Sequence, residues 1–350
     1  MKQVILPYSE TYHEVRSWNT AVDSLYNMLR YTDRKLSFAM VAGLTGQAFR
    51  LQIIPETVHI AGPTAYSFGD VMVRGLSSIG IKAEFIDALT PSIGPNANLI
   101  EPSLLQKDAM GKREIHHALP DALAFIHCAL DRGYPVLAWD IFFPEFGLLY
   151  GYDDNQKLLY AYECGRLDTL VYENLGRSVL EEIYVLALDE VFEITLQDQL
   201  RQALLMIVDH YEGREFNTPS ESVKGLKAYE VWCDAFRGGN IEPNGNAYNI
   251  AVVMDGRKQA SEFLLEMTRS WPQLEETDLR VRSLLGEAAE LYEEITRHFN
   301  ELHQQFPFPI GGEPNEPANA RRSIVLLETI KTKETEAVQI LREILERLAS

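Results

Sequence analysis

The sequence predicts an α+β protein in two parts: a domain with a mostly antiparallel sheet over residues 1–190 and an all-helical bundle domain over residues 191–350. Strand-like segments follow one another closely between residues 135 and 188, without the intervening helices that a parallel sheet requires. From about residue 190 onward apolar residues recur every three or four positions, and no convincing strand pattern remains. A chain of 350 residues is long enough to form two such cores.

Helical patterns dominate the beginning of the first part and strand patterns its end. Ser17 or Asn19 is suited to cap the first helix, and the turn Asp153-Asp154-Asn155 is typical of a hairpin. The stretch 88–114 is rich in proline and glycine and is expected to be a loop. The predicted helices cover 17–31, 37–43, 64–79 and 119–132, and the predicted strands cover 49–54, 83–86, 135–142, 146–152, 157–162, 168–171 and 182–188.

The second part shows the amphipathic periodicity of a helical bundle. A capping box at Thr218–Glu221 indicates the start of one helix. Each of the last two helices carries one apolar stripe, which must be buried against other helices. The predicted helices cover 193–212, 220–237, 246–270, 275–304 and 318–348.

Charge and cysteine content limit the possible partners and compartments. The formal net charge of −19 repels phosphate backbones and anionic lipids, so neither nucleic acid nor a membrane surface is an expected partner. Three widely spaced cysteines form neither a disulfide framework nor a metal-binding spacing, which favours a reducing, cytoplasmic location. The most apolar window, 134–152, contains two prolines and two acids, so we expect buried strands there and no membrane span.

Two segments of the first part share a pattern with a known family. The segment Thr20–Arg50, TAVDSLYNMLRYTDRKLSFAMVAGLTGQAFR, resembles the start of the N-terminal domain of butirosin-biosynthesis protein H and its relatives. That family is a branch of the papain-like cysteine peptidases and is related to the bacteriocin-processing peptidase domain. The later stretch GYPVLAWDIFFPEFGLLYGYDD resembles the family segment in which a histidine opens a strand. The resemblance covers roughly residues 15–190 and implies a papain-like fold for them.

The resemblance also implies where a catalytic triad would lie. The place of the nucleophilic cysteine falls at Thr20, the place of the histidine at Glu145, and the third place at Glu163. In the family, the thiol pKa falls beside the histidine, which then donates its proton to the leaving group. A hydroxyl beside a carboxylate has no comparable activation, so this sequence predicts the scaffold without papain-type hydrolysis.

Four further residues are candidates for lining the groove beside these positions. Trp18 and Asn19 lie at the start of the first helix, where the register of the nucleophile position is fixed only to within residues 17–20. Trp139 and Asp140 precede Glu145, and strand alternation directs such neighbours to opposite faces. We expect these four side chains to contribute to ligand binding, if a ligand binds.

Three functions remain open at the level of the sequence. The first is a non-peptidase accessory or ligand-binding protein, whose ligand is a small molecule, a peptide or an acyl-carrier-bound group from secondary-metabolite or peptide biosynthesis. The second is an acyl or aminoacyl transferase, or an amide hydrolase, that uses Glu145 as its base. A water-poor pocket shared by Glu145 and Glu163 near Thr20 would favour this enzyme. The third is a structural protein that forms a homo-oligomer through its bundle. No spacing indicates a metal site, and no cofactor is expected.

Overall fold

The structure, a computed structural model, describes residues 2–8, 17–89, 113–215, 222–273 and 275–349. It has the predicted α+β composition, with an antiparallel sheet and a C-terminal helical region. Contacts within the chain divide it into two compact units. The sheet unit comprises Met1–Leu36 and Ile81–Phe192, and the helical unit comprises Ser37–Gly80 and Glu193–Ser350.

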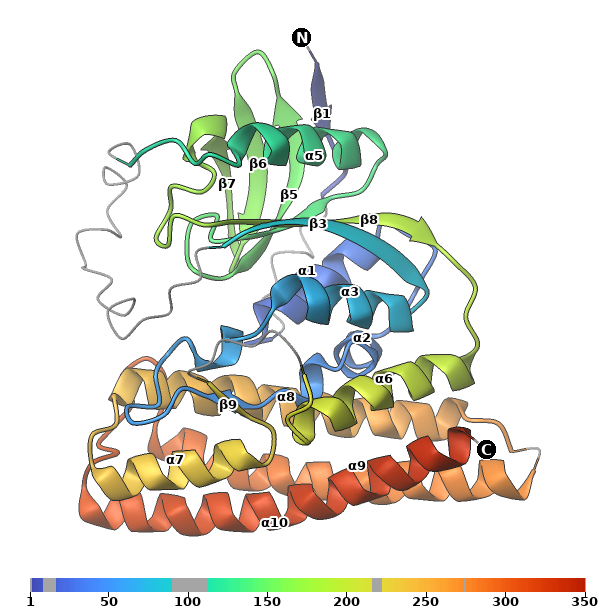
Figure 1. Cartoon of the computed structure of the whole chain (residues 1–350), viewed down its shortest axis with the longest axis vertical. Coiled ribbons are helices and arrows are strands. Elements are labelled where there is room, and N and C mark those ends of the chain that lie inside the picture. The colour runs from blue at the N-terminus through green and yellow to red at the C-terminus, as the bar shows by residue number, and fades with distance from the viewer. Residues whose placement is uncertain (1, 9–16, 90–112, 216–221, 274, 350) are drawn as a thin grey trace. The chain divides into compact units, whose positions relative to one another are not determined.

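The sheet unit is built on a seven-stranded sheet in the order β3-β8-β4-β5-β6-β7, with β1 paired to β5 outside this path (Figure 1). Every strand pair between the described residues of this sheet is antiparallel. The strands are β1 (Gln3–Ile5), β3 (Ile81–Ala88), β4 (Val136–Trp139), β5 (Phe146–Asp153), β6 (Leu158–Glu163), β7 (Arg166–Val171) and β8 (Ile183–Val191).

Two helices of the sheet unit pack on this sheet. Helix α5 (Leu119–Asp131) buries an apolar stripe that includes Ala122 and Ile126 against alternate residues of the central strands. Helix α1 (Thr20–Leu29) contacts β4 and β5. Of the two predicted caps for this helix, Asn19 is the N-cap, and its side chain accepts the N–H of Val22.

The strands and helices predicted for the sheet unit are present, with ends shifted by a few residues. The expected hairpin at Asp153-Asp154-Asn155 joins β5 to β6. Most of the predicted loop 88–114 lies outside the described residues, so that prediction stays open.

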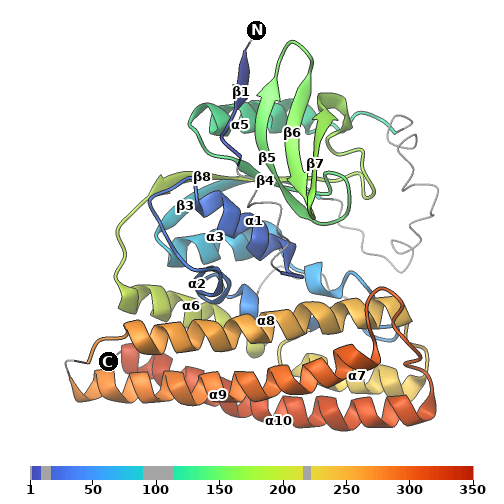
Figure 2. The same ribbon diagram turned by 180° about the vertical axis from the view of Figure 1, so that it is seen from behind.

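The helical unit contains seven α-helices among its described residues. Helices α8, α9 and α10 run side by side, as Figure 2 shows. The helices are α2 (Phe38–Leu44), α3 (Phe68–Ser78), α6 (Leu196–Tyr211), α7 (Lys227–Gly238), α8 (Pro243–Ser270), α9 (Glu276–Gln305) and α10 (Pro317–Leu348). Short 3-10 helices cover Gln47–Phe49 and Gly62–Thr64, and the strands β2 (Gln52–Ile53) and β9 (Val223–Lys224) form a small antiparallel pair.

The apolar stripes of the last two helices are largely covered within this chain. In α9 the side chains of Leu284, Ile295 and Phe299 are buried, and in α10 those of Leu327 and Leu341 are buried. No helix in the described part of the chain is apolar over enough residues to cross a membrane.

Strand β9 corrects the expectation that no strand follows residue 190 and that a helix begins near 220. Helix α7 begins only at Lys227, because Gly225 adopts a φ of +64° and closely approaches α6. A Cβ atom on Gly225 would lie 2.4 Å from the carbonyl oxygen of Tyr211, so only glycine fits there. The predicted capping box Thr218–Glu221 lies outside the described residues.

Segment 37–80 differs from the sequence-based boundary, because it clusters with the helical unit and not with the sheet. A Cβ atom on Gly43 would lie 2.0 Å from the ring of Phe263, which shows how closely α2 approaches α8. The guanidinium of Arg257 donates to the carbonyl oxygens of Ala48 and Arg50 at 3.1 and 3.0 Å. These contacts join residues about two hundred positions apart, which no local pattern can indicate.

Candidate functional site

Thr20 and Glu145 meet in the sheet unit. The Thr20 hydroxyl Oγ1 donates to Glu145 Oε2 at 2.6 Å and accepts the backbone N–H of Phe146 at 3.2 Å. Thr20 is the first residue of α1, and Glu145 immediately precedes β5. Both side chains are half-buried. A helix start therefore presents a hydroxyl directly to a carboxylate at the beginning of a strand.

Glu163 lies on the neighbouring strand. In the ladder between β5 and β6, Glu163 is paired with Gly147, two residues after Glu145. A Cβ atom on Gly147 would lie 2.8 Å from the Cβ of Glu163 and 2.4 Å from the carbonyl oxygen of Tyr162. Glycine at this position thus allows the Glu163 side chain to lie across the start of β5.

The Glu163 carboxylate binds the loop that carries Glu145. Its Oε1 accepts the N–H of Ile141 at 3.1 Å, and its Oε2 accepts the N–H groups of Phe142 and Phe143 at 2.8 and 2.9 Å. The loop closes on itself, because the N–H of Glu145 donates to the carbonyl oxygen of Phe143 at 2.7 Å. Glu163 is fully buried, so its oxygens are committed to fixing this loop.

Asp140 holds a second loop in the same way. It has a φ of +54°, an unusual conformation for a residue other than glycine, and its carboxylate is buried. The carboxylate accepts the N–H of Val179 at 3.2 Å and that of Leu180 at 2.7 Å. Two buried acids thereby anchor the loops at this end of the sheet.

Burial raises the pKa of both acids above ordinary carboxyl values. For Asp140, burial outweighs the two backbone N–H groups and raises the pKa to about 7. For Glu163, burial raises the pKa well above its usual value, Asp140 adds to the increase, and the three N–H groups oppose it. The two carboxyl groups therefore influence each other's titration.

The four expected ligand-binding residues differ in accessibility. Trp18 is 39% exposed and directly precedes the N-cap Asn19. Trp139 is buried, stacks at a tilt on Phe146 with ring centroids 4.7 Å apart, and donates its indole N–H to Glu182 at 3.0 Å. Asn19, Trp139 and Asp140 therefore all make structural contacts, and Trp18 presents the largest accessible apolar surface of the four.

A water-poor pocket shared by Glu145 and Glu163, which would favour an enzyme, is only partly present. Glu163 is fully buried, whereas Glu145 is half-buried, so the two do not share one water-poor pocket of equal depth. Cys164, which follows Glu163, is an exposed residue; partial desolvation of its sulfur and the nearby Glu145 and Glu163 raise the pKa of its thiol. That thiol stays protonated near neutral pH and is a poor nucleophile.

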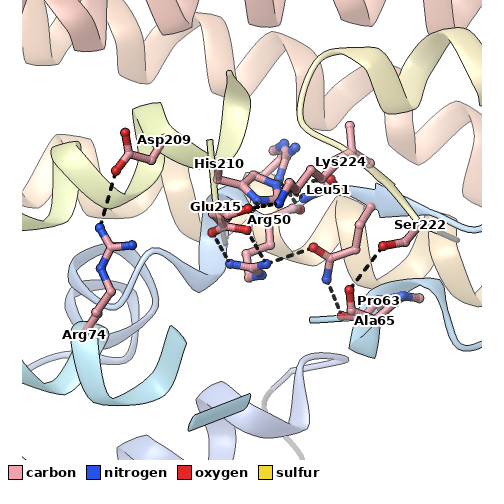
Figure 3. Close-up of polar contacts among 12 residues, drawn as sticks. Arg50, Leu51, Pro63, Ala65, Arg74, Asp209, His210, Glu215, Ser222 and Lys224 are labelled. Atoms are coloured by element: carbon pink, nitrogen blue, oxygen red, sulfur yellow. Dashed lines mark hydrogen bonds and ion pairs between the residues drawn. The ribbon is translucent and has the colours of Figure 1, made fainter. Parts of the chain in front are cut away.

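A second set of buried polar groups lies in the helical unit, and no sequence pattern predicted it. Arg50 binds Glu215 with two hydrogen bonds of 2.8 and 3.0 Å, and its guanidinium lies 4.4 Å from the ring centroid of Tyr66. His210 approaches the same carboxylate, with Nδ1 3.1 Å from Oε2 (Figure 3). Burial alone would raise the pKa of Glu215, but Arg50 and His210 lower it below the ordinary value.

A third set links five helices and the segment before β2. The fully buried pair Arg257 and Glu334 has an Nε–Oε1 distance of 2.5 Å. Tyr211 donates to Glu334 Oε1 at 2.5 Å, and Tyr229 donates to Glu334 Oε2. The hydroxyls of Tyr211 and Tyr292 lie 3.0 Å apart. Each polar atom of Glu334 thus has partners, as a buried charge requires.

Among the described residues, no group of three or more His, Cys, Asp or Glu side chains is placed to hold a metal ion. The three cysteines are free thiols.

No protein-family model matches this sequence, and the search of curated proteins found no match either.

Proposed function

We propose that residues 1–190 form a papain-like domain whose catalytic positions are filled by Thr20, Glu145 and Glu163, and that the protein binds a ligand as a non-peptidase accessory protein. The ligand class is a small molecule, a peptide or an acyl-carrier-bound group, from secondary-metabolite or peptide biosynthesis. A cytoplasmic location is part of this proposal and is supported by the free thiols of all three cysteines.

The single observation that carries the proposal is the hydrogen bond of 2.6 Å between Thr20 and Glu145, 125 positions apart in the sequence. It joins a helix start to a strand start, and Glu163 lies on the next strand. A papain-like triad uses these same three places for its nucleophile, its base and its third member. The resemblance in sequence and the arrangement in space therefore support the same assignment.

The chemistry of the three residues argues against hydrolysis. A carboxylate has an ordinary pKa of about 4.3, against about 6.5 for imidazole, so it is a weaker base toward a hydroxyl. Both oxygens of Glu163 accept hydrogen bonds from three backbone N–H groups, so Glu163 is not available to orient a base. The site therefore lacks an activated nucleophile.

One observation favours acyl transfer as a second candidate. The Thr20 hydroxyl donates toward the carboxylate of Glu145, which is the direction of proton transfer that a general base requires. If an amine acceptor is held close to a bound acyl group, proximity supplies much of the rate.

Turnover measurements separate the two candidates. We expect wild type, Thr20→Val and Glu145→Gln to react equally slowly with p-nitrophenyl acetate, a fluorogenic peptide amide and an N-acetylcysteamine thioester. Turnover that disappears in Glu145→Gln, together with an acyl adduct at Thr20 in the intact mass, would replace the binding proposal with the transferase.

Indole N–H signals in a ¹H–¹⁵N spectrum test binding directly, since the chain has four tryptophans. Peptide or thioester probes should shift the signals of Trp18 and Trp139, and leave those of Trp232 and Trp271 in the helical unit unchanged. Single Trp→Phe variants assign the signals. Equal shifts of all four, or none at millimolar probe, would contradict a ligand site at this end of the sheet.

A further inference from the structure

The side chain of His210 connects two backbone segments of the helical unit. It lies in the last turn of α6 and is buried. Its Nδ1 lies 3.1 Å from Glu215 Oε2, and its Nε2 lies 2.9 Å from the backbone nitrogen of Leu51 (Figure 3). One imidazole ring thus contacts a carboxylate on one side and a main-chain donor on the other.

These two contacts fit a neutral ring with its proton on Nδ1. A carboxylate only accepts hydrogen bonds, so Nδ1 carries the proton and donates it to Glu215. The Leu51 nitrogen only donates, so Nε2 is unprotonated and accepts. Burial lowers the pKa of His210 and Glu215 opposes that effect, which agrees with a neutral ring near pH 7.

The backbone of Leu51 links this ring to the strand pair β2–β9. Its carbonyl oxygen accepts the N–H of Gly225 at 2.9 Å, next to the paired residues Gln52 and Lys224. Its N–H donates to His210. The Leu51 backbone is therefore one of the links between this strand pair and α6, together with the hydrogen bond of 3.4 Å from the Leu226 N–H to the carbonyl oxygen of Tyr211.

A second proton on the ring would remove the acceptor of the Leu51 N–H. The Leu51 carbonyl oxygen lies 3.1 Å from Nε2 and has a second lone pair for the new proton, although it already accepts the Gly225 N–H. The Leu51 N–H, whose nitrogen lies 2.9 Å from Nε2, would then face that proton, donor against donor. The charged groups around the ring are Arg50, Lys224, Arg257 and Glu215, and Glu334 is paired with Arg257, so a new positive charge would join three cations and two anions.

We propose that His210 is a proton-sensitive staple of the helical unit. The neutral imidazole fastens the backbone before β2 to the end of α6, and protonation releases that backbone and loosens the β2–β9 pair. The proposal concerns only the helical unit and does not depend on the function proposed for Thr20, Glu145 and Glu163.

Hydrogen exchange on the full-length protein tests the staple. Peptides that cover 50–53 and 222–226 are followed at pH 7.5, 6.5, 5.5 and 5.0, with rates corrected for intrinsic exchange. One proton changes a local opening constant by at most about tenfold per pH unit. We expect protection in both peptides to be constant above pH 6.5 and to fall on the order of tenfold by pH 5.0.

Two histidine variants make the test specific. Glutamine both donates and accepts but does not titrate, so in His210→Gln the protection of both peptides should not depend on pH. His59 is also buried in this unit, with Nδ1 accepting the N–H of Ala61, and burial lowers its pKa. His59→Gln therefore serves as the matched control and should keep the wild-type loss of protection. An equal loss in His210→Gln, or no loss in wild type, overturns the proposal.

If His210→Gln does not fold, ¹⁵N chemical shifts of the wild-type ring decide instead. An unprotonated Nε2 at pH 7.5, which gains its proton over the same pH range in which protection falls, supports the staple. A proton on Nε2 at pH 7.5 contradicts it.

Discussion

The two units bury carboxylates in different ways. In the sheet unit, Glu163 and Asp140 accept five backbone N–H groups from loops at one end of the sheet. In the helical unit, Glu334 and Glu215 pair with the arginines Arg257 and Arg50. Helix interiors have no free N–H groups, because each already bonds within its helix. Loops do have free N–H groups, so a buried carboxylate can accept the hydrogen bonds that a helix or strand partner would otherwise accept.

The buried acids therefore have different roles in the two units. In the helical unit the buried acids neutralise cations and fasten helices to one another. In the sheet unit they define loop conformation, and one of those loops carries Glu145 to Thr20. Removing each acid should therefore change the stability of the protein by a different amount.

Breaking the buried ion pair should have the largest effect. Arg257→Met leaves Glu334 charged and fully buried, which typically costs about 4 kcal/mol in the free energy of unfolding. The double variant Arg257→Met/Glu334→Leu should recover a large part of that loss, because no charge remains buried. Urea denaturation measures both. A double variant less stable than the single one would mean that the unpaired charge of Glu334 is not the cause of the loss.

Removing the loop anchor should cost somewhat less. Glu163→Ala leaves three backbone N–H groups without an acceptor, and we expect a loss of about 3 kcal/mol. Glu163→Gln should cost less, because its amide oxygen still accepts, although its NH₂ group faces donors. Hydrogen exchange should locate the effect at 141–145. Unchanged protection there would show that Glu163 does not hold this loop.

The two units should respond to acid in opposite directions through these groups. Asp140 has a folded-state pKa of about 7, above the value of about 3.9 in an unfolded chain, so its ionised form costs stability above pH 7. That cost is relieved as the pH falls from 7 toward 4, by up to about 1.4 kcal/mol per pH unit. Relative to Asp140→Asn, wild type should therefore gain stability over this range. The lowered pKa of His210 has the opposite sign, and its contribution is lost below about pH 6.5.

Denaturant titrations at pH 7, 6 and 5 on wild type, Asp140→Asn and His210→Gln measure both contributions. A difference between wild type and Asp140→Asn that stays constant with pH would show that Asp140 does not titrate in this range.

The smallest effect is expected at the start of α1, where a side-chain oxygen also accepts a backbone N–H. Asn19 accepts the N–H of Val22, and Asn19→Ala should cost about 1 kcal/mol. The exposed pair Arg347 and Glu343 offers a control, because Arg347→Ala should change stability by less than about 0.5 kcal/mol. Equal effects of the two substitutions in thermal denaturation would argue against the cap.

Local patterns were sufficient to predict most helices and strands. The stripe that contains Leu284 and Phe299 correctly indicated a buried helix, because helix burial follows a local period. The clustering of 37–80 with the helical unit was not predictable from local patterns, since Gly43 and Phe263 meet across 220 positions of sequence. Strand β9 was missed because a two-residue strand has no period to detect.

The site could be predicted only in part. A family resemblance singled out Thr20, Glu145 and Glu163, and the structure joins the first two by a hydrogen bond and places the third on the adjacent strand. The role of Glu163 as a loop anchor was not predictable, because backbone donors carry no residue identity. The partnership of Arg50 with Glu215 spans 165 positions and has no spacing signal.

In the function proposed above, Thr20 and Glu145 occupy the nucleophile and base positions of a cysteine-hydrolase scaffold. The most direct measurement is the pH dependence of iodoacetamide alkylation at position 20 in Thr20→Cys/Glu145→His, mapped by peptide mass and compared with Thr20→Cys alone. An imidazole at hydrogen-bonding distance lowers a thiol pKa from about 8.5 to 7 or below. The double variant should be alkylated at least one pH unit lower than the single variant; identical profiles would show that the two residues do not occupy these positions.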